Sequence, residues 1–239
     1  MKNNQIINGK EFDRNTGLGG SDATRIYEGD CHQLWSEKTG KSQYPDLSDV
    51  LPVQMGIHTE PFNIQWFEKQ SEMKVRGNNE HFVHKDYEHL YSHPDGIIDS
   101  VNALLECKHT NAFSNAKKVA DKYKAQLQHN MMVCNYNKLY ISAFFGNLKY
   151  EVIEVDEDKE FQEQLLSAEL VFWHYVQADK EPPEYIDFSN FNKKEWHSTR
   201  AASRAISNDV VEYGKIVGFI FADNHCDRIY DWLLKWNKK

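Results

Sequence analysis

The feature of the sequence that most constrains its fold is residues 92–109, where a polar break separates two short apolar runs. The first run follows His-Pro-Asp-Gly, and the second continues into Leu-Glu-Cys-Lys. Apolar runs on either side of a turn predict a β-hairpin. Alternate side chains of a strand share a face, so Glu106 and Lys108 should point the same way. Leu105 and Cys107 should then point to the opposite face.

Asp95 stands at the head of the partner strand, where a hairpin of this length brings it beside Glu106. Two carboxylates would then meet the ammonium of Lys108 at the end of a sheet. Burying like charges together is costly unless an opposite charge compensates them. A divalent cation, which takes carboxylate oxygens as ligands, supplies that charge. A lysine that orients or deprotonates a metal-bound water is an arrangement for phosphodiester hydrolysis. The alternative is a solvated hairpin of alternating charges, against which the apolar flanks argue.

Composition narrows the class of protein. The chain has 239 residues, 40% hydrophobic and 27% charged, which predicts one large globular domain or one domain with an extension. Four scattered cysteines form no CxxC pair, so neither a zinc ribbon nor an iron–sulfur cluster is indicated and a reduced cytoplasmic setting is expected. We expect no membrane span and no signal peptide. The net charge of -8 argues against non-specific coating of nucleic acid, but it is compatible with a nuclease.

A glycine-rich loop near the start of the chain forms a second candidate site. It contains three glycines that permit close backbone approach, Gly17, Gly19 and Gly20. Ser21 or Asp22 is predicted to cap the helix that follows. Backbone amides at a helix start bind anions, and Arg14 is placed to reach the same anion. The alternative is an ordinary capped helix.

Periodicity predicts the remaining elements in outline. Polar, strand-like residues 75–91 hold several histidines that form no convincing zinc set, His81, His84, His89 and His93. The expected helices are 23–27, 33–39, 53–72, 114–120, 121–135 and 157–177, and the expected later strands are 138–145 and 148–155. Beyond Pro183 the patterns are weaker. They predict helices at 196–206 and 223–238, and the apolar segment 210–221 is ambiguous between strand and helix.

Two helices carry polar residues that need an explanation. Pro61 predicts a helix start or bend, where the Glu60 carboxylate would turn inward or lie exposed in a first turn. Gln126 and Gln128 lie on a helix with many apolar neighbours, and a buried amide needs hydrogen-bond partners. The alternative for each glutamine is a solvent-facing position.

The motifs occur in a recognisable order: Arg with Gly-x-Gly-Gly-Ser-Asp-Ala, Leu-Trp-x-Glu-Lys-Thr-Gly, a helix with Gly…Glu-Pro, His-Pro-Asp-Gly, Leu-Glu-Cys-Lys and Tyr-x-x-Gln-x-Gln. In this combination residues 14–184 resemble the YqaJ-type, lambda-exonuclease-like phage recombination nucleases of the PD-(D/E)xK superfamily. The resemblance implies an α/β (α+β) fold with a central mixed sheet flanked by helices. It predicts a nuclease domain over 1–184 and a C-terminal extension, 185–239, whose role the sequence does not indicate.

The resemblance assigns roles around the hairpin. It makes Asp95, Glu106 and the backbone carbonyl of Cys107 metal ligands. Glu60 becomes a helix carboxylate beside the metal, and Lys108 becomes the catalytic lysine. The implied cofactor is Mg²⁺ or Mn²⁺.

The resemblance also assigns residues outside the hairpin. Gln126 and Tyr123 would help to place the nucleophile, with Gln128 as the alternative to Gln126 because the choice depends on helix phase. Arg14 and Ser21 match the positions that hold a 5′-phosphate. The segment between the catalytic lysine and this helix is short, which would trim a DNA-contacting element.

The expected function is a metal-dependent DNA exonuclease, acting 5′ to 3′ on linear duplex in phage-type recombination or end resection. The partners that the resemblance implies are duplex DNA ends, a single-strand annealing protein and further copies of the chain in a ring trimer. The expected location is the cytoplasm of a bacterium or phage-infected host cell. The alternatives are an endonuclease of the same fold and a non-catalytic module that binds DNA ends or a partner. The intact D…ExK set argues against the latter.

Overall fold

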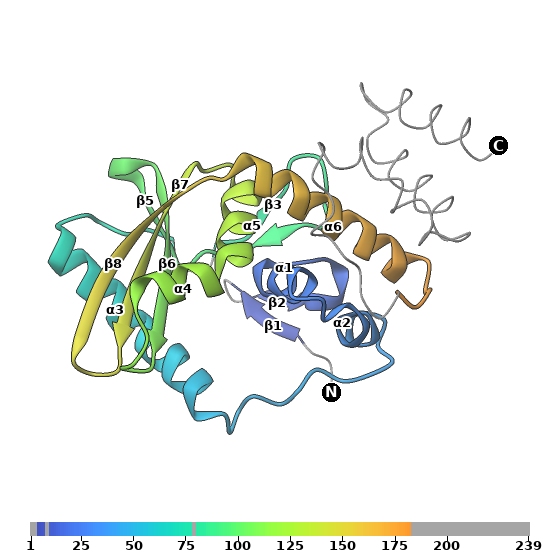
Figure 1. The fold of residues 1–239 in the computed structure, drawn as a ribbon, viewed down its shortest axis with the longest axis horizontal. Coiled ribbons are helices and arrows are strands. Elements are labelled where there is room, and N and C mark those ends of the chain that lie inside the picture. Colours follow the sequence, from blue (N-terminus) through green and yellow to red (C-terminus); the bar gives the residue numbers. More distant parts are fainter. Residues whose placement is uncertain (1–3, 8–9, 78–79, 183–239) are drawn as a thin grey trace, which may run out of the picture.

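The computed structural model describes residues 4–7, 10–77 and 80–182, and a four-stranded mixed sheet lies at its centre (Figure 1). The first and last strand pairs are antiparallel and the middle pair is parallel. In sheet order the strands are β5 (Gly96–Ile98), β6 (Ala103–Thr110), β7 (Lys138–Phe145) and β8 (Lys149–Asp156). The expected mixed sheet flanked by helices is confirmed.

The predicted hairpin is formed by β5 and β6 and is turned by the short helix η2 (Asp99–Val101). Asn102 closes the turn in the left-handed region, at φ 49°, which asparagine tolerates better than most residues. Ile97 pairs with Leu104, and both are completely buried. The hairpin is therefore a core element with apolar contacts on both faces.

One face of the sheet is covered by α3 (Leu51–Ser71), through a cluster of Phe67, Ile98 and Leu105. The other face is covered by α4 (Ala116–Lys122) and α5 (Lys124–Cys134). The apolar residues of that second cluster include Leu104, Leu127, Met131 and Ile141. Each fully buried side chain of this size contributes roughly 1.5–3 kcal/mol, so these two clusters hold β6 firmly between helices.

A second helical layer packs against the outer side of α5, formed by α1 (Gly20–Tyr27), α2 (Cys31–Lys38) and α6 (Lys159–Gln177) (Figure 1). Its core contains Leu18, Ile26, Leu34, Trp35 and Phe172. Two small antiparallel pairs complete the described chain: β1 (Asn4–Ile7) with β2 (Lys10–Asp13), and β3 (Phe82–Val83) with β4 (Tyr91–Ser92). The 3-10 helix η1 (Arg14–Thr16) follows β2.

Three local features differ from the expectations, although the helix expected over residues 53–72 is present. Helix α3 begins at Leu51, so Pro61 lies in its interior and Glu60 is in mid-helix, not in a first turn. Proline lacks an amide donor, and one helical hydrogen bond is missing there. Residues 75–91 form only short strands, and the β1–β2 pair was not anticipated.

The expected elements at 196–206, 210–221 and 223–238 lie outside the described residues, as does the boundary between 184 and 185. The two-part division of the chain therefore stays a prediction. Of the helices within the described ranges, none has the length and apolar character needed to cross a membrane.

Candidate active site

Strand β6 presents Glu106 and Lys108 on one face, as its alternation predicts. Lys108 Nζ donates to Glu106 Oε1 at 2.6 Å, and Glu106 is only 3% exposed. On the partner strand side, Asp95 Oδ2 accepts a hydrogen bond from the Cys107 amide at 2.6 Å. The Cys107 side chain packs against the opposite, α3-covered cluster. The hairpin register thus brings the two carboxylates and the lysine together.

Helix α5 contributes two amides that bind the same carboxylate. Gln126 Nε2 donates to Glu106 Oε1 at 2.8 Å, and its own Oε1 accepts from Lys108 Nζ at 3.4 Å. Asn130 Nδ2 donates to Glu106 Oε2 at 3.2 Å, while Asn130 Oδ1 accepts from the Ser92 hydroxyl at 2.9 Å. Asn130 was not predicted as a site residue. Its place one helical turn after Gln126 was the available signal.

Tyr123 and Gln128 have different surroundings. The Tyr123 ring lies between α4 and α5, with Lys108 Nζ 4.4 Å from its centroid. Gln128, by contrast, donates to the Asp156 carbonyl at 2.9 Å and ties α5 to the end of β8. The helix phase therefore directs Gln126 to the carboxylates, and the alternative assignment of Gln128 is wrong.

Helix α3 reaches the site from the other face of the sheet. The Asn63 side chain donates to the carbonyls of Ser142 at 2.8 Å and Lys108 at 3.3 Å, which anchors α3 across β6 and β7. Glu60 lies three residues earlier in α3, close enough to act electrostatically on Asp95. The helix carboxylate is therefore near Asp95, and its expected role beside a metal stays a prediction.

The site carries excess negative charge. Burial raises the pKa of Asp95 well above its usual value, and the neighbouring Glu106 and Glu60 raise it further. Burial acts to lower the pKa of Lys108, but Glu106 and Asp95 outweigh it and the pKa is raised. Lys108 thus remains an ammonium at neutral pH, which donates hydrogen bonds and does not accept a proton. Glu106 and Asp95 act on the one ammonium, and Glu60 acts on Asp95.

The donor set fits a divalent cation in charge and in ligand type, since hard cations take carboxylate and carbonyl oxygens. In the part of the chain that the structure describes, no three His, Cys, Asp or Glu side chains already converge as a metal-binding group. Both oxygens of Glu106 accept hydrogen bonds from protein groups. Cation binding by these residues would add to, or replace, the hydrogen bonds that Glu106 and Asp95 accept. The Cys107 carbonyl stays a predicted ligand.

The glycine-rich loop is held rigidly against β4. The Leu18 amide donates to the His89 carbonyl at 2.7 Å, and the Tyr91 amide donates to the Leu18 carbonyl at 2.9 Å. A Cβ at Gly17 would lie 2.2 Å from the His89 carbonyl oxygen, and one at Gly20 would lie 2.6 Å from Asn130 Oδ1. Glycine is thus required for close packing, and the start of α1 directly adjoins a residue that binds Glu106.

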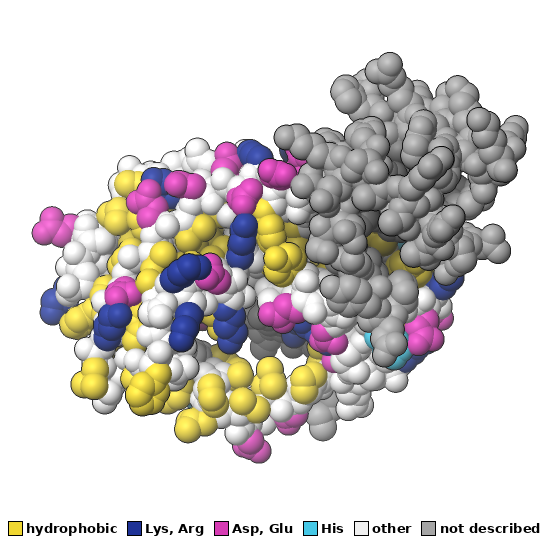
Figure 2. Space-filling model, viewed as in Figure 1, with side chains coloured by type: hydrophobic (Ala, Val, Ile, Leu, Met, Phe, Trp, Pro, Cys, Tyr) yellow, Lys and Arg dark blue, Asp and Glu magenta, His cyan; other side chains and the backbone are white. Residues whose placement is uncertain are grey.

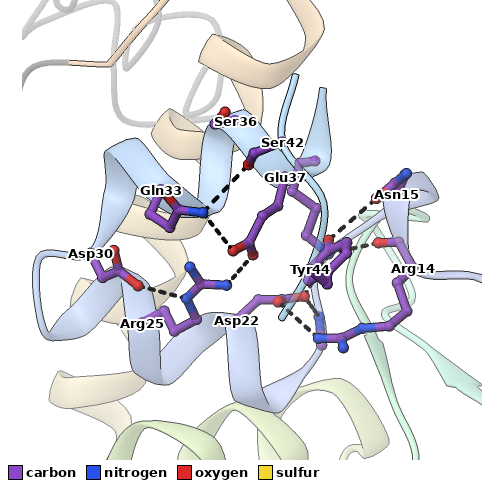
Figure 3. A network of polar contacts seen from close by, with 12 residues as sticks. Arg14, Asn15, Asp22, Arg25, Asp30, Gln33, Ser36, Glu37, Ser42 and Tyr44 are labelled. Atoms are coloured by element: carbon purple, nitrogen blue, oxygen red, sulfur yellow. Dashed lines mark hydrogen bonds and ion pairs between the residues drawn. The ribbon is translucent and has the colours of Figure 1, made fainter. Parts of the chain in front are cut away.

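The start of α1 differs from the prediction that Ser21 or Asp22 is the N-cap. Gly19 is the N-cap, and its amide donates at 3.0 Å to Asp22, which lies three residues further on. Asp22 is completely buried, with Lys38 Nζ 2.7 Å from Oδ2 and Arg14 Nη2 3.6 Å from Oδ1 (Figure 3). Burial acts to raise the pKa of Asp22, but Lys38 and Arg14 outweigh it and the pKa is lowered.

The two predicted phosphate ligands flank this helix start. Ser21 is exposed in the first turn of α1. Arg14 lies over the Tyr44 ring, 4.7 Å from its centroid, and its side chain is 31% exposed. The Ser21 side chain is therefore exposed and that of Arg14 partly exposed, whereas Asp22 is buried.

A basic surface adjoins the site along α4. Its exposed lysines precede Tyr123, the residue whose ring contacts Lys108, and they are Lys117, Lys118 and Lys122. Figure 2 shows Lys and Arg side chains gathered over this part of the molecule, with a row of hydrophobic side chains along the edge below. Exposed apolar residues of that region include Leu47, Val50, Leu51 and Met55. A local positive surface thus exists despite the net negative charge.

The fold defined by this sheet and its helices is shared with a known nuclease structure. The alkaline exonuclease LHK-Exo from Laribacter hongkongensis superposes with a TM-score of 0.58, covering 78% of this chain and 96% of that one. The same values hold for the structure of LHK-Exo in complex with dAMP. Sequence identity is 13%, so this likeness concerns the fold alone.

The sequence identifies the family. Residues 11–137, more than half of the chain, match the YqaJ-like viral recombinase domain, and the protein belongs to that family. It is 29% identical over 173 residues to the uncharacterized protein YqaJ of Bacillus subtilis (strain 168). That match covers 68% of this chain and 54% of the relative, so the chain spans about half the relative's length. The family resemblance expected from the motifs is confirmed.

Proposed function

We propose that this protein is a metal-dependent deoxyribonuclease that digests linear duplex DNA from its ends. The observation that carries the proposal is the surplus of acids on and beside β6: Glu106 pairs with Lys108, and Glu106 and Glu60 both act on Asp95. Membership of the YqaJ-like family and the fold of an alkaline exonuclease support it. A module that only bound DNA ends would gain no stability from clustered carboxylates.

Asp95, Glu106, Glu60 and the Cys107 carbonyl would hold Mg²⁺ or Mn²⁺. A bound ion of this kind acidifies water and stabilises negative charge on phosphoryl oxygens. Lys108 would donate a hydrogen bond to the developing charge, because its raised pKa keeps it protonated.

Neighbouring side chains keep the reactive groups in place. Gln126 binds both Glu106 and Lys108, and so holds their relative positions. The Tyr123 ring lies against the Lys108 ammonium and limits the directions in which the ammonium can donate hydrogen bonds. Asn130 fixes the second oxygen of Glu106. Rigid support of this kind preserves the alignment on which the rate depends.

The start of α1 would bind the terminal 5′-phosphate through Arg14 and Ser21. A terminal phosphate carries more negative charge than an internal diester, so an arginine at a helix start favours it. The close approach of Gly20 to Asn130 supports a pocket next to the residues around Glu106. Holding the end would present the next phosphodiester to the carboxylates, which supports 5′-to-3′ polarity and little sequence preference.

We extend the proposal to the biological setting on the strength of the family. Assembly as a ring trimer, action with a single-strand annealing protein and a role in phage-type recombination rest on the resemblance. The exposed lysines of α4 support contact with the DNA backbone, since such contacts are made to phosphates.

The test compares linear and circular duplexes, with and without a 5′-phosphate, in Mg²⁺ or EDTA. We expect Mg²⁺-dependent loss of linear duplex only, faster with the phosphate. Arg14→Ala should slow digestion of phosphorylated ends by about 10- to 100-fold, since a lost charge-assisted contact costs about 1.5–3 kcal/mol. The effect of Arg14→Ala on 5′-hydroxyl ends should be small. Removal of the 5′-phosphate and Arg14→Ala should not have additive effects on the rate, because both remove the same interaction.

Arg76→Ala is the matched control, because Arg76 pairs with Asp99 and Glu80 at the edge of the sheet. Equal rates on both kinds of end for the unchanged protein would contradict the phosphate pocket. Cutting of a closed circle would favour the endonuclease. Tight binding to ends without cleavage in any metal would favour the binding module.

A further inference from the structure

Lys38, at the end of α2, is completely buried and makes three short hydrogen bonds. Its Nζ donates to the Arg14 carbonyl at 2.6 Å, to the Gly17 carbonyl at 2.7 Å and to Asp22 Oδ2 at 2.7 Å. A lysine ammonium has three donors, so all of them are used within the protein. Lys38 therefore does not contact DNA itself, and any effect on the substrate acts through the loop.

The charge of Lys38 is directed to Asp22 alone among the nearby acids. The adjacent Glu37 is also buried, but it pairs with Arg25 and accepts from the Gln33 amide (Figure 3). Arg25 in turn also binds Asp30. This second group of charges is satisfied without Lys38.

Asp22 poses a difficulty for an anion site at the start of α1. Its carboxylate already binds the Gly19 amide, and as a negative charge it would repel a phosphate held by Arg14 and Ser21. It also forms an ion pair with the Arg14 guanidinium, whose Nη2 lies 3.6 Å from Oδ1, and so offsets the charge that would bind the phosphate. The formal charges of Asp22, Arg14 and Lys38 sum to +1, whereas those of Asp22 and Arg14 alone sum to zero.

We propose that Lys38 is the positioning residue that makes the pocket selective for a 5′-phosphate, a role that rests on the function proposed above. Lys38 neutralises Asp22 and ties two loop carbonyls to the same point. One net positive charge then remains beside the loop for the DNA end. The selectivity of the pocket thus depends on a residue that the DNA does not touch.

The experiment measures the ratio of digestion rates on 5′-phosphorylated and 5′-hydroxyl linear duplex, using the full chain in Mg²⁺. Lys38→Met should lower this ratio by about 10- to 100-fold, the loss typical of a charge-assisted contact. The loss should appear as a higher KM for phosphorylated ends. Lys41→Met is the matched control, because Lys41 lies three residues on, over the Trp35 ring, and pairs with Asp179.

A double variant separates charge from packing. In Lys38→Met with Asp22→Asn, the amide oxygen still accepts from Gly19 but no carboxylate faces Arg14. The double variant should recover part of the selectivity for 5′-phosphorylated ends that Lys38→Met loses. No such recovery is expected if Lys38 only fills space. The pair is removed together, so this variant also serves if the single variant does not fold.

The outcomes distinguish the two proposals. A ratio of one in the unchanged protein overturns the phosphate pocket and the role of Lys38 with it. A ratio that is high in the unchanged protein and persists in folded Lys38→Met overturns the role of Lys38 alone. A double variant no more selective than folded Lys38→Met overturns the charge mechanism.

Discussion

Two carboxylates, the buried Asp22 and the half-buried Asp95, lie in contrasting electrostatic surroundings. Asp22 is paired with Lys38 and faces Arg14, and these cations lower its pKa despite burial. Asp95 lies near Glu106 and Glu60, and its pKa is raised by partial burial and by these acids. The first cluster is electrostatically complete, while the second has more acids than cations. Burial of an acid is therefore a weak functional signal, and a surplus of charge is a stronger one.

The two clusters are joined through α5. Asn130 binds Glu106 and also lies against Gly20, at the start of the helix that carries Asp22. The cluster around Asp22 thus supports the pocket proposed for the DNA end. The cluster around Asp95 and Glu106, called the charge-rich cluster below, is the one proposed to cleave the phosphodiester. The following predictions test this division of roles.

The largest effect should come from the charge-rich cluster. Lys108→Met removes the ammonium among three carboxylates, and loss of one stabilising donor typically costs about 10²- to 10³-fold in turnover. We expect at least that loss on 5′-phosphorylated linear duplex, with the circular dichroism spectrum unchanged. Lys85→Met, an exposed change outside both proposed sites, is the control. Near-normal turnover of Lys108→Met would remove that residue from the mechanism.

The next effect concerns stability at Asp22. Asp22→Asn leaves Lys38 buried without its partner, and breaking such a pair costs about 3–5 kcal/mol in the free energy of unfolding. Because the folded pKa is lowered, this contribution is complete above the unfolded pKa of about 3.9 and is lost as the pH falls through the folded pKa. Urea unfolding should therefore show a large gap at pH 7 that narrows in acid.

The exposed change Asp86→Asn is the control for that measurement, expected to stay within about 0.5 kcal/mol. If the difference in free energy of unfolding between the unchanged protein and Asp22→Asn did not depend on pH, the pairing of Asp22 with Lys38 would not be electrostatic.

A smaller effect of opposite sign is expected at Asp95. Asp95→Asn keeps an oxygen for the Cys107 amide and removes one of the three clustered charges. Metal-free protein should gain about 0.5–2 kcal/mol in the free energy of unfolding, as when functional strain is removed, while losing cleavage. A loss of stability at neutral pH in EDTA would contradict the charge surplus.

The smallest effect is stabilisation by Mg²⁺. At a concentration ten times the dissociation constant, binding should raise the melting temperature by roughly 3–6 °C. The rise should disappear in Asp95→Asn and persist in Arg14→Ala. No rise up to about 10 mM would argue that the cluster binds no ion with useful affinity.

The sequence by itself determined the hairpin and the faces of β6. Alternation over residues 103–110 and a polar break are local properties, so they placed Glu106 and Lys108 together and Asp95 beside them. The order of most helices and strands and the family motifs were likewise readable from short stretches. Glu60 was found through its motif, although its mid-helix position was not.

Only the tertiary structure decided which distant side chains meet. Gln126 and Gln128 are equivalent in local pattern, and the packing of α5 on the sheet directs one to Glu106 and the other to Asp156. Asp22 looked like a helix cap until folding buried it against Lys38. Asn130 likewise gained its place from two contacts with residues far away in the chain. Helix phase and long-range pairing arise when elements pack, and no local pattern contains them.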